Sequence, residues 1–161
     1  MIKPLLQDDA LLADVDAAKS DRPNFRLWGL GQSGFLMQFN GRHALVDPYL
    51  SDSLTAKYEQ SDKPHVRMTE RVIAPERLGF VDVVSSSHNH TDHFDPDTLK
   101  PLLVAKPALP LILPEANRGA GAFRIGLSLK AANLIGVRAG DVKSAGGFTF
   151  NGIPAAHNEL E

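Results

Sequence analysis

A valine-rich stretch runs directly into a cluster of histidines and aspartates near the middle of the chain. The stretch FVDVVSSS, residues 80–87, has the β-branched composition of a buried strand. Three histidines and two aspartates follow it within eight positions, from His88 to Asp95. Because α/β folds usually place their sites at the carboxyl ends of strands, the chain is expected to fold around this strand with a polar site at its end.

The spacing inside the cluster suits metal binding. Side chains alternate sides along an extended chain, so His88 and His90 can point toward one ion. A tight turn after them lets Asp92 and His93 face a second ion. Imidazole and carboxylate donors without thiolate suit zinc, manganese or iron. The alternatives are a solvated surface loop or an incidental metal scavenger. Both are disfavoured because four ligands in six positions directly after a strand form a specific motif.

Three further histidines carry weaker signals. His157 follows the strand-like stretch FTFNGIPAA and repeats the strand-then-histidine arrangement, although alone it would be an ordinary partly buried histidine. His43 lies on an expected strand and His65 in a polar segment, so both are expected to be structural or surface residues. The alternative for either is a place in a substrate pocket.

The composition excludes several classes of function. The chain of 161 residues contains no cysteine, so disulfides and thiolate ligands are excluded. Its 17 basic and 19 acidic residues give a net charge of −2, which argues against nucleic-acid and anionic-membrane partners. The N-terminus carries acidic residues where a signal peptide needs an apolar run, and no stretch is long enough to span a membrane. We expect a soluble cytoplasmic protein.

The first half of the chain is dominated by strand patterns. A helix is expected over 8–19, capped by Asp8 or Asp9. The Asn40-Gly41 pair predicts a hairpin turn. Strands are expected over 25–30, 34–39 and 43–47, followed by a long loop over 51–71 and a weak helix over 74–79.

The second half alternates strands and helices. A helix is expected from Asp95 or Asp97 to about Ala105, and a second hairpin is expected to turn at Asn151-Gly152. Between them lie a strand over 109–114, a helix over 114–127 and a strand over 133–137. The mixture predicts a layered α/β fold in a single domain over 1–161, with 1–24 as an N-terminal helical extension.

The motif His88-x-His90-x-Asp92-His93 resembles the signature of the metallo-β-lactamase superfamily, and the chain is most similar to its L-ascorbate-6-phosphate lactonase-like branch. The stretches LWGLGQSGFLMQFNGRHALVDPYLSD and RAGDVKSAGGFTFNGIPAAHNE support this resemblance, which covers residues from about 25 onward. It implies an αββα sandwich of two similar halves. The chain resembles the N-terminal half, so an apolar sheet face is expected to be exposed.

The resemblance also implies roles for single residues. Two divalent ions, Zn2+ or Mn2+, would occupy the complete site, with a bridging aspartate and a last histidine supplied by the second half. Asp92 would also orient the attacking water as the catalytic residue. Asp47 matches an aspartate that supports the ligands, although it could equally be a residue that simply makes a turn. The metal ligands would be His88, His90 and His157 for the first ion, and Asp92 and His93 for the second.

Two functions remain open at this stage. The first is a metal-dependent hydrolase of a lactone, ester or phosphodiester, most like a sugar-phosphate lactonase, acting on a small anionic or cyclic ester. The second is an incomplete metal-binding half-domain that is inactive alone and needs a homo-oligomer or a complementary C-terminal half. Antibiotic hydrolysis is disfavoured by His93 and the lack of cysteine, and nucleic-acid processing by the net charge.

Overall fold

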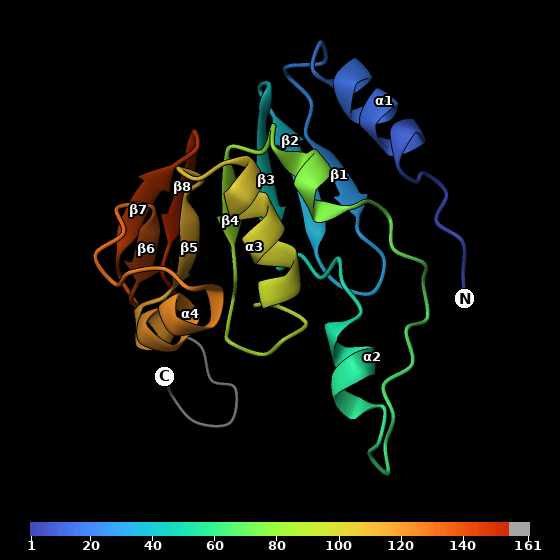
Figure 1. Ribbon diagram of the computed structural model, residues 1–161. Helices are drawn as coiled ribbons and strands as arrows, with labels where there is room; N and C mark the ends of the chain where they lie inside the picture. The colour runs from blue at the N-terminus through green and yellow to red at the C-terminus, as the bar shows by residue number, and fades with distance from the viewer. Residues whose placement is uncertain (155–161) are drawn as a thin grey trace.

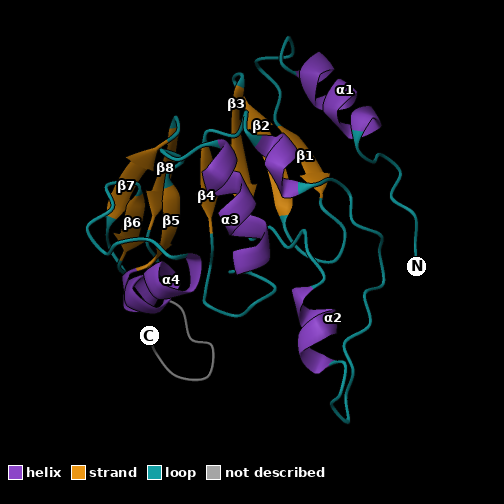
Figure 2. Cartoon of the chain, in the orientation of Figure 1, coloured by secondary structure: helices purple, strands orange, loops and turns teal. Residues whose placement is uncertain are grey.

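A six-stranded mixed sheet organises the computed structural model, which describes residues 1–154 (Figures 1 and 2). The spatial order of the strands is also their order along the chain. The first three strands pair antiparallel, and the third to the sixth pair parallel. The strands are β1 (Arg26–Gly29), β2 (Phe35–Phe39), β3 (Arg42–Val46), β4 (Val83–Ser85), β5 (Leu111–Pro114) and β6 (Leu134–Val137).

Helices cover one face of this sheet and build the main core. Figure 1 shows α1, α3 and α4 on the same side of the strands, with α2 projecting beyond the sheet edge. Leu11 and Val15 of α1 and Leu99 of α3 are buried in the cluster that lines this face. The helices are α1 (Asp9–Ala18), α2 (Ser53–Tyr58), α3 (Pro96–Ala105) and α4 (Arg118–Ile125), with 3-10 turns at Pro75–Leu78 and Glu115–Asn117. The expected layered α/β fold is confirmed.

A hairpin covers part of the opposite face. Its strands are β7 (Val142–Ala145) and β8 (Phe148–Asn151), and Phe148 and Phe150 pack against a second apolar cluster on β3, β4 and β5. The β1–β2 side of the sheet keeps large apolar side chains in solvent. The exposed fractions are 51 % for Leu27, 46 % for Phe35 and 48 % for Phe39.

The two hairpin predictions had different outcomes. Asn40 and Gly41 do form the β2–β3 turn, with positive φ angles of 50° and 75°. The second turn was predicted at the wrong pair, because it lies at Gly146-Gly147, with φ angles of 59° and 86°. The Gly152 amide donates to the Asp141 carbonyl at 2.8 Å, so the Asn151-Gly152 pair prolongs the strand pairing instead of ending it.

The predicted loop over 51–71 was wrong in part, because α2 lies inside it. This helix has six residues and buries only Leu54, so no repeated apolar pattern marks it in the sequence. Its start is held from outside by the buried carboxylate of Asp95, which accepts hydrogen bonds from the Ser51 hydroxyl at 2.6 Å and the Ser53 hydroxyl at 3.0 Å. Contacts with a residue distant in sequence therefore stabilise the start of this helix.

Smaller differences concern element ends. The predicted strand over 80–87 is limited to β4. Asp8 does occupy the position before α1, but it makes no side-chain capping bond, and both Asp8 and Asp9 pair with Arg77 instead. The start of α3 follows prediction, because the Asp95 carboxylate accepts from the Asp97 amide at 3.2 Å.

Gly34 supports the end of β3 by leaving room for it. Its φ is +86°, and an added Cβ would press on the Asp47 carbonyl oxygen and lie 2.9 Å from the Cα of Pro48. Gly41 has a similar φ of +75° but open space around it. Gly41→Ala should therefore cost about 1–2 kcal/mol of unfolding free energy from backbone strain. Gly34→Ala should cost about 1–3 kcal/mol more, because the neighbouring backbone must move.

Urea denaturation of the two variants checks this expectation. Equal midpoints for Gly34→Ala and Gly41→Ala would mean that the crowding against Asp47 does not matter.

Candidate active site

The histidine cluster lies in the loop between β4 and α3, residues 86–95, which we call the signature loop. β3, β4 and β5 run parallel, so their carboxyl ends meet at this edge of the sheet. Asp47 follows β3 directly, and its amide donates to the Ser85 carbonyl at 2.9 Å. The topology thus places Asp47 beside the signature loop, 40 residues further along the chain.

Three imidazole rings gather in the signature loop. The ring centroids of His88 and His93 lie 4.2 Å apart, with planes tilted by 40°. Those of His88 and His90 lie 4.7 Å apart, with planes at 70°. The structure therefore brings together the three histidines that the spacing singled out.

The Asp47 carboxylate connects this cluster to the end of β3. One oxygen accepts from the Ser87 amide at 2.6 Å. The other accepts from the Ser87 hydroxyl at 2.7 Å and lies 2.9 Å from Nδ1 of His93. Asp47 also has a positive φ of 46°, so it turns the chain as well as contacting the cluster. The two alternatives for Asp47 are therefore compatible, while its support of a metal ligand stays a prediction.

His93 lies between two carboxylates. Its Nδ1 contacts Asp47, and its Nε2 lies 3.4 Å from an oxygen of Asp92. The Asp92 side chain is 44 % exposed, whereas that of Asp47 is 15 % exposed. An aspartate buried behind an imidazole fixes the orientation of the ring, and an exposed one can reach a ligand. Asp47 is therefore placed to orient the His93 ring, whereas Asp92 faces solvent.

Backbone contacts fix the shape of the signature loop. The buried Ser86 hydroxyl oxygen lies 2.8 Å from the His88 carbonyl oxygen and 2.9 Å from that of His93. The amides of His93 and Phe94 donate to the His90 carbonyl at 3.0 and 2.7 Å. This is the tight turn that the spacing predicted after His90.

Arg124 of α4 holds the same loop from the other side, and sequence reasoning missed it. Its guanidinium donates to the Asn89 carbonyl and to the Thr91 hydroxyl, the latter at 3.3 Å. It lies 5.3 Å from the ring centroid of Phe94. Burial lowers the pKa of Arg124 below its usual value, and the Asp95 carboxylate partly offsets this. The only sequence feature that could have indicated Arg124 is its position as a basic residue in the last turn of a helix.

The donor set suits a divalent ion, but the described residues do not form a closed site. Imidazole nitrogens and a carboxylate are ligands for zinc or manganese. Within residues 1–154, no three histidine, aspartate or glutamate side chains are arranged to hold one ion. His157 lies outside the described residues. The predicted ligand set thus stays a prediction, with His88, His90, Asp92 and His93 in one loop.

Residues of the signature loop line two cavities. A cavity of about 560 Å³ is lined by His90 and Asp92 together with Arg124 and residues of α2. A second cavity of about 860 Å³ is lined by Asp47, His88 and the ends of β4, β5 and β6. Both volumes fall in the range of small-molecule sites.

The two remaining histidines behave differently. His43 is buried away from the loop, packed edge-on against Phe80 with ring centroids 5.1 Å apart, and burial lowers its pKa. This agrees with the structural role expected of it. His65 lines the 560 Å³ cavity, while its place in a substrate pocket stays a prediction.

A family model described as "Beta-lactamase superfamily domain" matches residues 26–161, which is most of the chain. The chain belongs to the beta-lactamase superfamily. A comparison with curated protein sequences finds no match.

Three solved structures are similar to this superfamily member, and the first of them shares its fold. A protein of Parabacteroides distasonis described as a metal-dependent hydrolase has 14 % identity and a TM-score of 0.51, over 81 % of this chain and 46 % of its own. An isothiocyanate hydrolase from Delia radicum gut bacteria has 23 % identity and a TM-score of 0.48, over 73 % and 42 %. A mutant of CmlA β-hydroxylase has 16 % identity and a TM-score of 0.48, over 83 % and 28 %. The chain thus covers less than half the length of each of these three proteins.

The described part of the superfamily chain contains no helix long and apolar enough to cross a membrane.

Replacement of Arg124 should loosen the signature loop. Arg124→Gln removes the two hydrogen bonds to Asn89 and Thr91, each worth about 1 kcal/mol. Amide hydrogen exchange across residues 89–92 should then quicken about tenfold. Arg118→Gln is the matched control, because Arg118 lies on the same helix but pairs with Glu115. The same exchange rates in both variants would contradict this role for Arg124.

Proposed function

We propose that the chain carries the metal-binding loop of a metal-dependent hydrolase that cleaves a lactone, ester or phosphodiester. The observation that carries the proposal is the meeting of three imidazoles with two differently placed aspartates, in a member of the beta-lactamase superfamily. Resemblance to the ascorbate-6-phosphate lactonase-like branch favours a small anionic or cyclic ester, such as a sugar-phosphate lactone.

Each residue of the loop has a separate task in this proposal. His88 and His90, with His157, would hold one divalent ion, and Asp92 and His93 a second. Bound divalent ions supply the Lewis acidity that activates water and polarises the bond to be cleaved. Zn2+ and Mn2+ both suit this donor set.

The surrounding side chains position these groups. The Asp47 carboxylate accepts a hydrogen bond from Nδ1 of His93. The other ring nitrogen, Nε2, therefore faces Asp92. Asp92 borders the 560 Å³ cavity, where its carboxylate can accept a hydrogen bond from the attacking water and orient it. Ser87 bridges Asp47 and His88, which holds the His88 ring near the end of β3.

A second candidate is a metal-binding half-domain that is inactive alone. It is favoured by the lack of a three-ligand group within residues 1–154 and by the chain's coverage of only 46 % of the first structural relative. The missing ligands would then come from a complementary C-terminal half or from another copy. Both candidates use the same loop, but only the first predicts turnover by this chain.

Hydrolysis assays with added zinc or manganese test the proposal. The substrates are a simple lactone, a nitrophenyl ester and a bis-nitrophenyl phosphodiester. His88→Ala and Asp92→Ala should each lower kcat/KM by about 100-fold or more, because each removes a ligand or the group that orients water. Asp62→Ala is the control, since Asp62 is exposed and lies outside the cavity lining.

Unchanged hydrolysis in His88→Ala and Asp92→Ala would refute the proposed function. No turnover by the wild-type chain, with turnover on addition of a C-terminal half, would select the second candidate.

A further inference from the structure

The 560 Å³ cavity has a second wall besides the one that carries His90 and Asp92. This wall consists of Leu54, Lys57 and Tyr58 of α2, with His65 from the segment that follows. It adjoins the reacting centre of the proposed function, yet nothing in the metal chemistry uses its side chains.

Lys57 is a cation on this wall that has no ion-pair partner among the described residues. Lys57 is exposed, and within residues 1–154 its ammonium group forms no ion pair but lies 5.0 Å from the ring centroid of Tyr58. Asp92 is the only carboxylate among the described cavity-lining residues, and the proposed function commits it to the metal. Arg124 already donates to the signature loop. The ammonium group of Lys57 therefore has no ion-pair partner among the described residues.

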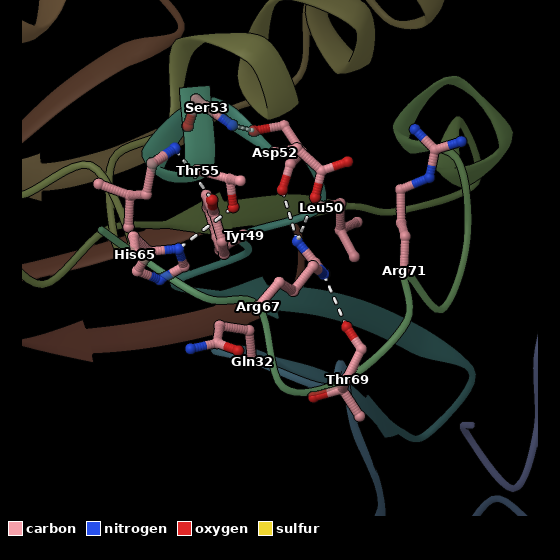
Figure 3. Close-up of polar contacts among 12 residues, drawn as sticks. Gln32, Tyr49, Leu50, Asp52, Ser53, Thr55, His65, Arg67, Thr69 and Arg71 are labelled. Carbon is pink, nitrogen blue, oxygen red and sulfur yellow. Dashed lines mark hydrogen bonds and ion pairs between the residues drawn. The ribbon is translucent and has the colours of Figure 1, made fainter. Parts of the chain in front are cut away.

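His65 adds a donor on the same wall. Its Nδ1 lies 3.3 Å from the Thr55 hydroxyl, and its ring packs edge-on against Tyr49 with centroids 6.3 Å apart (Figure 3). When Nδ1 accepts from Thr55, Nε2 carries the proton. That N–H has no partner among the described residues and is free to donate to an oxyanion.

Buried contacts hold this wall in place. Arg67 is 7 % exposed and donates to the Thr69 carbonyl at 2.8 Å and the Ser51 carbonyl at 2.5 Å (Figure 3). Its guanidinium also lies 5.2 Å from the ring centroid of Tyr49, the residue that packs on His65. On the neighbouring turn, Gln32 accepts from the Met68 amide at 3.0 Å. The backbone that follows His65 is thus held by Arg67 and by the Met68 amide, which lowers the entropy cost of binding there.

We propose that Lys57 and His65 bind an oxyanion group of the substrate, a carboxylate, phosphate or sulfate, and direct the bond to be cleaved toward His90 and Asp92. This inference rests on the proposed function for the identity of the reaction. It adds that charge on the substrate is recognised from α2, a segment outside the metal-binding loop. The cavity volume suits a small molecule that spans the two walls.

Anion binding tests the site without reference to catalysis. The isotope-labelled chain is titrated with inorganic phosphate, sulfate and acetate, and amide shifts are followed by NMR. The signals of residues 54–58 and of His65 should move on addition of at least one anion. Lys57→Gln should weaken that binding about tenfold, because a charged hydrogen bond is lost. Lys57→Arg should largely restore it.

Lys63→Gln is the matched control, because Lys63 is exposed, lies on the same segment and is absent from the described lining. Anion binding that is unchanged in Lys57→Gln, or weakened equally in Lys63→Gln, would overturn the proposal. So would the absence of shifts at α2 and His65 with all three anions.

A pair of esters separates this inference from the proposed function. One is neutral and the other differs only by a carboxylate distant from the ester bond. Lys57→Gln should raise KM about tenfold for the charged ester alone, with kcat little changed. Hydrolysis without this difference would overturn the anion site and leave the function standing. Anion binding at Lys57 without hydrolysis of either ester would support the anion site and contradict the proposed function.

Discussion

The Asp47 carboxylate is the contact on which the rest of the site depends. It joins the end of β3 to Ser87 and His93, and so fixes the signature loop relative to the parallel strands. Asp47 itself turns the chain with a positive φ, and Gly34 leaves the space that this turn requires. A side chain that both turns a strand end and contacts an imidazole connects the fold directly to the histidine cluster.

The signature loop is in turn held from several directions. Ser86 and the turn at His90 fix its backbone from within, and Arg124 fixes it from α4. Contacts among the described residues thus fix where the three imidazoles lie. The same short loop supplies side chains to both cavities.

Local patterns predicted the parts of the structure that depend on neighbouring residues. The Asn40-Gly41 turn, the Asp95 cap and the clustering of the histidine rings between His88 and His93 are all short-range features. Contacts between distant segments were not visible in the sequence. α2 depends on Asp95, the loop on Arg124, and the cavity wall on Arg67, and no local pattern marks these partners. The second hairpin was misplaced because Gly-Gly and Asn-Gly both permit a turn, and pairing with Asp141 decided between them.

The most direct test of this account is the metal content of the purified chain. The protein is incubated with zinc or manganese, desalted, and analysed by elemental mass spectrometry beside a His88→Ala, Asp92→Ala double variant. The account predicts bound metal on the wild-type chain and its loss in the variant, because both ions draw ligands from the signature loop. Equal metal content in the two proteins, or none in either, would contradict the assignment of this loop as a metal centre.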